Sequence, residues 1–127
     1  MTNYEYFTTL ANSKVYIMDA QTHLRYESRA RIIKAIAHPT RLFIIEELQK
    51  TPTSVGELAD MIGSDMSTVS KHLSVLKNAG IVSDERKGTS ITYRLKTPCL
   101  LNFIGCVEDV IETNAQDQIE ILKCCKP

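Results

Sequence analysis

The chain has 127 residues, which suits one domain of ordinary size with one hydrophobic core. Its 15 basic residues are balanced by 15 acidic ones, which argues against a general binder of polyanions. No apolar run approaches the ~18 residues needed to cross a bilayer and no signal-peptide pattern opens the chain, so we expect a cytoplasmic protein that does not contact membranes.

The N-terminal part of the chain predicts two helical segments. Residues 1–22 hold too many apolar side chains for a disordered tail, so we expect a helix there, packed on the body of the protein or on a second copy. Residues 24–37 also show apolar side chains at helical spacing. We therefore predict a helical extension over residues 1–22, followed by a domain that spans residues 23–96.

A histidine and a proline separate that second segment from the next one. Pro39 suits the first turn of a helix over residues 40–50, because its missing N–H would be unpaired there in any case. Leu42, Ile45 and Leu48 share one face of this helix. We expect His38 and Arg41 to cap and brace helix ends rather than to bind a ligand.

Residues 54–80 predict two short helices joined by a tight turn. Apolar side chains at helical spacing mark the first helix over residues 54–62, and Gly63 permits the turn. Asp65 is a natural N-cap for the second helix. The buried stripe of that second helix is expected to consist of Val69, Leu73 and Leu76.

The opposite face of the second helix carries short hydroxyls, a cation and an imidazole. This division, with one face packed and one face able to reach phosphates and base edges, is what a DNA-binding helix-turn-helix requires. An ordinary helical hairpin is the alternative interpretation. The candidate DNA contacts on this helix are Ser67, Thr68, Ser70, Lys71 and His72.

Residues 81–96 predict a β-hairpin with a charged tip, because two strand-like runs flank Lys87 and Gly88. Such a wing follows the recognition helix in winged-helix DNA binders, so Arg86, Lys87 and Thr89 are further candidate DNA contacts. Between residues 66 and 96 the chain has six basic and two acidic residues, whereas residues 97–127 have two basic and five acidic ones. The basic charge therefore lies on the segments that are expected to contact DNA.

The last segment, residues 97–127, predicts a long helix and a cysteine-containing tail. Thr97 and Pro98 are typical of an N-cap and a first helical position, and we expect the helix to run from Pro98 to Leu122. Its broad apolar stripe suits a dimer interface better than the core of one copy. The stripe consists of Leu100, Phe103, Ile104, Val107, Val110 and Ile111.

Three runs of sequence resemble the ArsR/SmtB (arsenic-repressor) family of winged-helix transcriptional repressors. They are KAIAHPTRLFIIEEL at residues 34–48, STVSKHLSVLKNAGIV at residues 67–82 and GTSITYRL at residues 88–95. The resemblance covers residues 31–95. It implies a mainly α-helical winged helix-turn-helix with a small β-hairpin that forms a homodimer through its terminal helices. It also implies binding to an inverted-repeat operator in double-stranded DNA and release when an inducer binds, with no catalytic residues and no obligatory cofactor.

Several inducer sites known in the resembled family have no counterpart here. The cysteine pair of the best-known arsenic site corresponds to Ser54 and Gly56, and no histidine follows His72 to build the family's zinc site on the last helix. Persulfide-sensing members also use a cysteine in the helix that matches residues 39–50, which holds none here. The inducer chemistry therefore depends on other residues.

All four cysteines of the chain lie within or just beyond the last predicted helix. They are Cys99, Cys106, Cys124 and Cys125. We hypothesise that they form a sulfur-rich site for trivalent arsenic, antimony or a soft metal ion. Cys99 and Cys106 stand ~10 Å apart along a regular helix axis, whereas two thiolates on one ion must lie within about 4 Å. Either the first helical turn unwinds, or further thiols come from elsewhere, for example from a second copy.

Three other interpretations of the cysteines remain open. The thiols can act in redox or persulfide sensing, with a bridge from Cys99 or Cys106 to a tail cysteine. In the second interpretation, Cys106 packs in an interface as a small apolar side chain, and the tail cysteines have no role in sensing. A reductase that uses the adjacent pair Cys124 and Cys125 is the third, although no acid/base pair or cofactor loop accompanies it.

Overall fold

The computed structural model describes residues 18–125, which divide into two units, one up to Ile32 and the other from Ile33 onward. The first unit consists mainly of helix α2 (Ala20–Ile36), whose last turn belongs to the second unit. Asp19 precedes this helix, and its carboxylate accepts a hydrogen bond of 2.7 Å from the backbone N–H of Thr22. The helix therefore begins at Ala20, earlier than expected. The helix expected within residues 1–22 lies largely outside the described residues.

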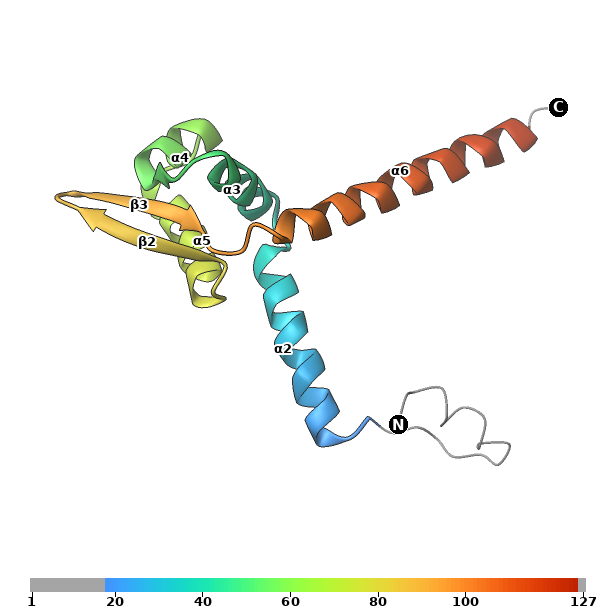
Figure 1. The fold of residues 1–127 in the computed structure, drawn as a ribbon. Coiled ribbons are helices and arrows are strands. Elements are labelled where there is room, and N and C mark those ends of the chain that lie inside the picture. The colour runs from blue at the N-terminus through green and yellow to red at the C-terminus, as the bar shows by residue number, and fades with distance from the viewer. Residues whose placement is uncertain (1–17, 126–127) are drawn as a thin grey trace. The chain divides into compact units, whose positions relative to one another are not determined.

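The second unit contains four helices and three short strands (Figure 1). The strands form one antiparallel sheet in the order β1-β3-β2, in which β2 and β3 are a hairpin and β1 pairs with β3. In chain order the elements are α3 (Pro39–Lys50), β1 (Thr53–Ser54), α4 (Val55–Ile62), α5 (Met66–Asn78), β2 (Val82–Lys87), β3 (Ser90–Leu95) and α6 (Leu100–Cys124). This mainly α-helical winged arrangement confirms the fold class predicted from the sequence.

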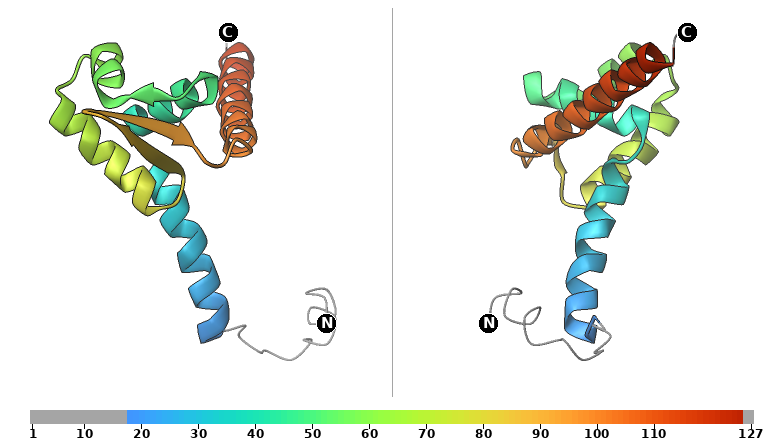
Figure 2. Two further views of the ribbon diagram at one scale, coloured as in Figure 1. Left: turned by 60° about the vertical axis from the view of Figure 1, so that its left-hand side comes forward. Right: turned by 90° about the vertical axis from the view of Figure 1, so that its right-hand side faces the viewer.

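The core of the second unit lies between α3, α4, α5 and the sheet. Its fully buried side chains are Ile44, Ile45, Leu58, Val69, Leu73, Leu76 and Val82. The predicted stripe of α5 is thus confirmed. Helix α5 packs against β2 along one side of the hairpin, as the left view of Figure 2 shows. The recognition helix and the wing therefore form one packed body.

Helix α6 begins at Leu100 rather than at the predicted Pro98. The chain first makes a tight turn, in which the N–H groups of Leu100 and Leu101 donate to the carbonyls of Thr97 and Pro98 at 3.1 and 3.2 Å. Thr97 is consequently not the N-cap; Cys99 takes that position, with no hydrogen bond from its side chain to the helix backbone. The helix also continues to Cys124, beyond the predicted end at Leu122.

The apolar side chains of α6 are mostly uncovered. Leu100, Leu101 and Ile104 pack against the core from its first turns, but no residue of the helix is buried. Phe103 and Ile111 are 43% and 63% exposed. Across residues 18–125, no helix is both long enough and apolar enough to pass through a membrane.

Candidate nucleic-acid interface and sensing site

Local hydrogen bonds fix both helices of the helix-turn-helix. A reciprocal capping box opens α4, in which the Ser54 hydroxyl accepts from the Glu57 N–H at 3.2 Å and the Glu57 carboxylate accepts from the Ser54 N–H at 3.3 Å. Gly63 ends α4 with a φ of +75°, a left-handed conformation that glycine adopts without strain. The turn predicted at this position is therefore confirmed.

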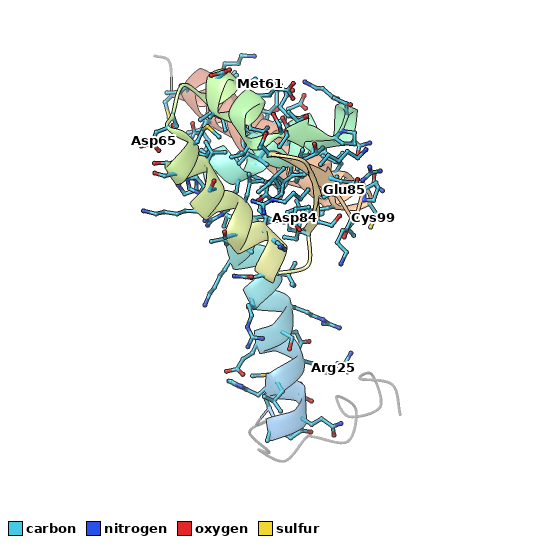
Figure 3. All side chains as sticks on the ribbon, turned by 90° about the vertical axis from the view of Figure 1, so that its left-hand side faces the viewer. Arg25, Met61, Asp65, Asp84, Glu85 and Cys99 are labelled. Carbon is cyan, nitrogen blue, oxygen red and sulfur yellow. The ribbon has the colours of Figure 1, made fainter. Side chains whose placement is uncertain are left out.

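Asp65 opens the recognition helix, as the sequence predicts. Its carboxylate accepts a hydrogen bond of 2.7 Å from the Thr68 N–H. Figure 3 shows Asp65 at the N-terminal end of α5, with Met61 on the neighbouring helix. The hydrogen bonds from Thr68 lower the pKa of Asp65, since they favour its charged form.

The outward face of α5 is polar and exposed. Lys71 lies on it, with Ser67 one turn earlier and Thr68 beside it, and all three are exposed. The 3.6-residue period places Ser74 and Asn78 on the same face, and both are exposed. These two residues are not among the DNA contacts predicted from the sequence, although the helical spacing of residues 67, 71, 74 and 78 indicates a shared face.

Ser70 and His72 lie on the flanks of α5 rather than on its outward face. Both are half-buried. The Ser70 carbonyl accepts a hydrogen bond of 2.9 Å from the Ser74 hydroxyl. The His72 ring lies 4.4 Å from the ring of His38, measured between centroids. A contact of either side chain with DNA remains a prediction. Because both side chains are half-buried, such a contact is less favoured than one from the exposed Lys71.

The β2–β3 hairpin carries the predicted basic tip. Gly88 has a φ of +62° in the turn, and Arg86, Lys87 and Thr89 around it are exposed. The Nζ of Lys87 lies 4.0 Å from Oε1 of Glu85, which is a weak contact between exposed side chains. Among residues 18–125, Arg86 has no ion-pair partner. The hairpin tip is therefore free to contact a phosphate.

An ion pair ties the recognition helix to the wing. Lys77 of α5 and Asp84 of β2 lie 2.9 Å apart. Their hydrogen bond lowers the pKa of Asp84 and raises the pKa of Lys77. Since both side chains remain substantially exposed, the pair contributes little to stability. Because Lys77 is paired with Asp84, it is not one of the unpaired basic side chains of residues 66–96.

His38 caps α3, as predicted. Its Nδ1 accepts a hydrogen bond of 3.1 Å from the N–H of Thr40, and Pro39 occupies the first turn. Arg41 lies on the same helix, with a buried Nε that donates to no partner in the described part of the chain. The two residues thus lie at the N-terminal end of α3, next to His72 of the recognition helix.

The four cysteines are all exposed. Cys99 precedes α6, Cys106 lies near its start, and Cys124 and Cys125 lie at its end. In the described range, 18–125, no group of three or more Cys, His, Asp or Glu side chains lies close enough to hold a metal ion. One copy of the chain therefore does not bring these thiols together.

The α4–α5 pair and the β2–β3 hairpin together define the winged helix-turn-helix class of DNA-binding domain. The sequence profile described as "Bacterial regulatory protein, arsR family" matches residues 38–84. The HTH-type transcriptional regulator Rv0081 of Mycobacterium tuberculosis is 31% identical over 99 residues, which are 77% of this chain and 87% of that protein. Its crystal structure matches 74% of this chain and 95% of its own, with a TM-score of 0.65.

Two further proteins extend this comparison. The transcriptional repressor SdpR of Bacillus subtilis is 34% identical over 86 residues, which are 68% of this chain and 96% of that protein. A homodimeric winged helix-turn-helix domain from Mycobacterium bovis, described as a possible ArsR-family regulator, matches with a TM-score of 0.66 at 25% identity and covers 81% of this chain and 95% of its own. The chain belongs to the ArsR family of bacterial regulators and is a DNA-binding transcriptional repressor rather than an enzyme.

Proposed function

We propose that this repressor is a homodimer that releases an inverted-repeat operator when trivalent arsenic, antimony or a soft metal ion binds its C-terminal cysteines. One observation carries the proposal. All four thiols of the chain are exposed, and they lie within α6 or at the residues that flank its two ends, on the helix whose apolar side chains are also left uncovered. A ligand that binds there acts on the same helix that, in this proposal, joins two copies.

The apolar side chains of α6 support dimer formation. They continue along the helix from Leu100 to Leu122, and those beyond the first turns are exposed, including Val110, Ile111 and Leu122 at 58%, 63% and 68%. An uncovered apolar stripe of this length is typical of a helix that packs on a second copy. The homodimeric domain from M. bovis has the same fold, which agrees with this assignment.

The positions of the cysteines favour a site between two copies. Cys106 and Cys124 are separated by 18 residues, or five turns at 3.6 residues per turn, so they lie on one side of α6 about 27 Å apart. No ion bridges that distance. If two α6 helices pack antiparallel around the midpoint of the apolar stripe, near residue 111, Cys99 of one copy lies opposite Cys124 and Cys125 of the other.

The donor chemistry fits soft, thiophilic ligands. Thiolates bind soft ions in preference to hard ones, and exposed thiols are accessible to them. A three-sulfur site would take Cys99 and the tail pair from two copies, with Cys106 joining if the first turn of α6 unwinds. Binding would favour a dimer geometry in which the recognition helices no longer match two half-sites, which requires different affinities for the two geometries.

The DNA contacts belong to the same proposal. Ser67, Thr68 and Lys71 are assigned to the major groove or its phosphates, with Ser70 and His72 on the flanks of the helix. Arg86, Lys87 and Thr89 of the wing are assigned to the minor groove or the backbone. The exposed positions of Ser74 and Asn78 add two candidates for base contacts.

The direct test of the sensing site is the arsenite affinity of the reduced protein and of cysteine variants. We expect Cys99→Ser and the double variant Cys124→Ser/Cys125→Ser to lose at least about tenfold in affinity, because a three-coordinate site loses one or two ligands. Asn114→Ser, an exposed change on the same helix, is the matched control and retains full affinity. Unchanged affinity in every cysteine variant would overturn the proposed site.

Thiol redox or persulfide sensing is the second candidate. The exposure of all four thiols favours it as well, since accessible thiols are the ones that oxidants reach. Intact-mass spectrometry after treatment with peroxide or polysulfide distinguishes the two candidates. A bridge between Cys99 or Cys106 and a tail cysteine supports redox sensing, whereas metalloid binding requires the reduced thiols.

A further inference from the structure

Three potentially cationic side chains meet where α3 begins and the recognition helix passes it. His38 caps α3, Arg41 follows one turn later, and His72 comes from the middle of α5. The rings of His38 and His72 lie 4.4 Å apart between centroids, with 41° between their planes. All three side chains are half-buried. We call these three residues the histidine junction.

In the described part of the chain, no carboxylate forms an ion pair with the histidine junction. Helix α5 packs against α3, α4 and β2. Within the described residues, no Asp or Glu of these elements forms an ion pair with His38, Arg41 or His72, and Asp84 of β2 pairs with Lys77 instead. The Arg41 Nε is buried without an acceptor. Any proton added to either histidine therefore places a second positive charge beside Arg41.

Protonation also changes the hydrogen bonding of the junction. His38 Nδ1 accepts the N–H of Thr40, so this nitrogen carries no proton while His38 caps the helix. An imidazolium has no acceptor nitrogen, and protonation of His38 therefore removes the cap of α3. Burial lowers the pKa of His72, and the nearby His38 and Arg41 lower it further. The packed junction thus favours neutral histidines.

We propose that the histidine junction is an acid-sensitive coupling between α3 and the recognition helix, through which a fall in pH weakens operator binding. In its neutral form the junction holds α5 against the start of α3. When the two histidines are protonated, they repel each other and Arg41, and α3 loses its N-cap. The recognition helix then loses a contact that fixes its position for the major groove. The DNA-binding part of this inference rests on the proposed function.

The sign of the pH effect separates this role from a direct contact with DNA. If His72 touched a phosphate, protonation would add a favourable charge pair and acid would tighten binding. The junction requires the opposite result, because the DNA-bound geometry keeps both histidines neutral. For stability the same sign holds: a lowered His72 pKa means that the unfolded chain binds protons more tightly. The contribution of neutral His72 to the free energy of unfolding is therefore fully present above about pH 6.5, the ordinary pKa of histidine. It is lost as the pH drops below that value.

The test is operator affinity by fluorescence anisotropy at pH 7.5 and at pH 5.5, at constant ionic strength. We expect the wild-type protein to bind about tenfold more weakly at pH 5.5, the change produced by one pKa unit of differential proton binding. The double variant His38→Asn/His72→Gln removes both titrating groups, while asparagine can still cap the helix. It is expected to bind equally at both pH values.

The chain offers a matched control, since it has three histidines and the third belongs to the other unit. His23 is exposed on α2, where it lies 3.4 Å from Glu27. His23→Gln is expected to retain the full pH effect. Affinity that is the same at both pH values, that rises at low pH, or that falls equally in the double variant would overturn the proposal.

An NMR titration of the imidazole resonances gives a readout without DNA. We expect His72 to titrate below the ordinary pKa of histidine, and His38→Asn to shift the His72 midpoint upward by removing a like charge. If the protein fails to bind any operator at pH 7.5, the proposed function fails while this titration still tests the junction. A His72 midpoint at the ordinary histidine value that His38→Asn leaves unchanged would overturn the junction itself.

Discussion

The helix-turn-helix and the terminal helix differ in where their apolar side chains are covered. Leu73 and Leu76 of α5 are completely buried within one copy of the chain. Local hydrogen bonds fix both ends of α4 and the start of α5. Helix α6 has an equally regular apolar stripe but no buried residue. One region is complete in a single chain, whereas the other leaves its apolar side chains uncovered.

This difference explains the distribution of function that we propose. The part that binds DNA is held by its own core and therefore keeps its shape. The part that joins two copies depends on contacts between chains, so a ligand on α6 changes the spacing of the two recognition helices without disturbing either domain. The following four changes test this contrast.

The largest effect is expected for Leu73→Ala in the core beneath the recognition helix. Loss of a fully buried leucine costs about 3 kcal/mol, from lost apolar burial and the cavity left behind. The free energy of unfolding should be measured by urea denaturation at one fixed protein concentration, because dimer formation contributes to it. Val75→Ala, at a side chain 38% exposed, is the control and should cost about 0.5 kcal/mol. Equal losses would contradict the assignment of the two faces of α5.

Ile111→Lys is expected to break the dimer and to leave the domain folded. A charge buried at the interface without a partner costs ~3 kcal/mol, which raises the dimer dissociation constant about 100-fold. Sedimentation velocity should show the monomer, with an unchanged far-ultraviolet circular dichroism spectrum. Gln116→Lys adds the same charge on the opposite side of α6 and should remain dimeric. If both variants stayed dimeric, α6 would not form the interface.

Lys71→Ala tests the outward face of the recognition helix. In a homodimer the substitution removes one phosphate contact from each copy, so it should weaken binding at least about tenfold and reduce the slope of log affinity against log salt by about one unit per copy. Lys50→Ala is the control, because Lys50 lies at the end of α3 and pairs with Glu47. The comparison requires titrations at several salt concentrations. An unchanged slope for Lys71→Ala would show that this lysine does not contact a phosphate.

Ser54→Ala should have the smallest effect of the four. It removes the hydroxyl that accepts the Glu57 N–H in the capping box, which costs ~1 kcal/mol in the free energy of unfolding. Ser54→Asp, which retains a capping oxygen, should recover most of this loss. Operator affinity is expected to stay the same at the temperature of the assay. A loss shared by both variants would mean that the cap is not the stabilising feature.

The sequence predicts the helix-turn-helix well because its determinants are local. The cap at Asp65, the left-handed turn at Gly63 and the stripe of Val69, Leu73 and Leu76 each depend on residues within a few positions of each other. The same reasoning identified His38 as a helix cap. Short-range hydrogen bonds and helical periodicity are enough to specify these features.

The features that the sequence failed to specify depend on longer-range packing or on small differences in backbone geometry. The contact between the rings of His72 and His38 joins two helices, and no local pattern in the sequence indicates it. Pro98 is compatible with a first helical position and also with the tight turn that precedes Leu100, so the start of α6 was placed too early. The arrangement that we propose for the cysteines depends on a second copy, which the sequence of one chain does not describe.

In the function that we propose, a ligand on the C-terminal cysteines releases the repressor from DNA. The most direct measurement is fluorescence anisotropy of the reduced protein on DNA from upstream of its own gene, with and without stoichiometric arsenite. We predict tight binding without arsenite, release with it, and no release for a variant in which all four cysteines are serine. Tight binding that ignores arsenite, followed by release with polysulfide or peroxide, would contradict metalloid sensing and favour the redox alternative.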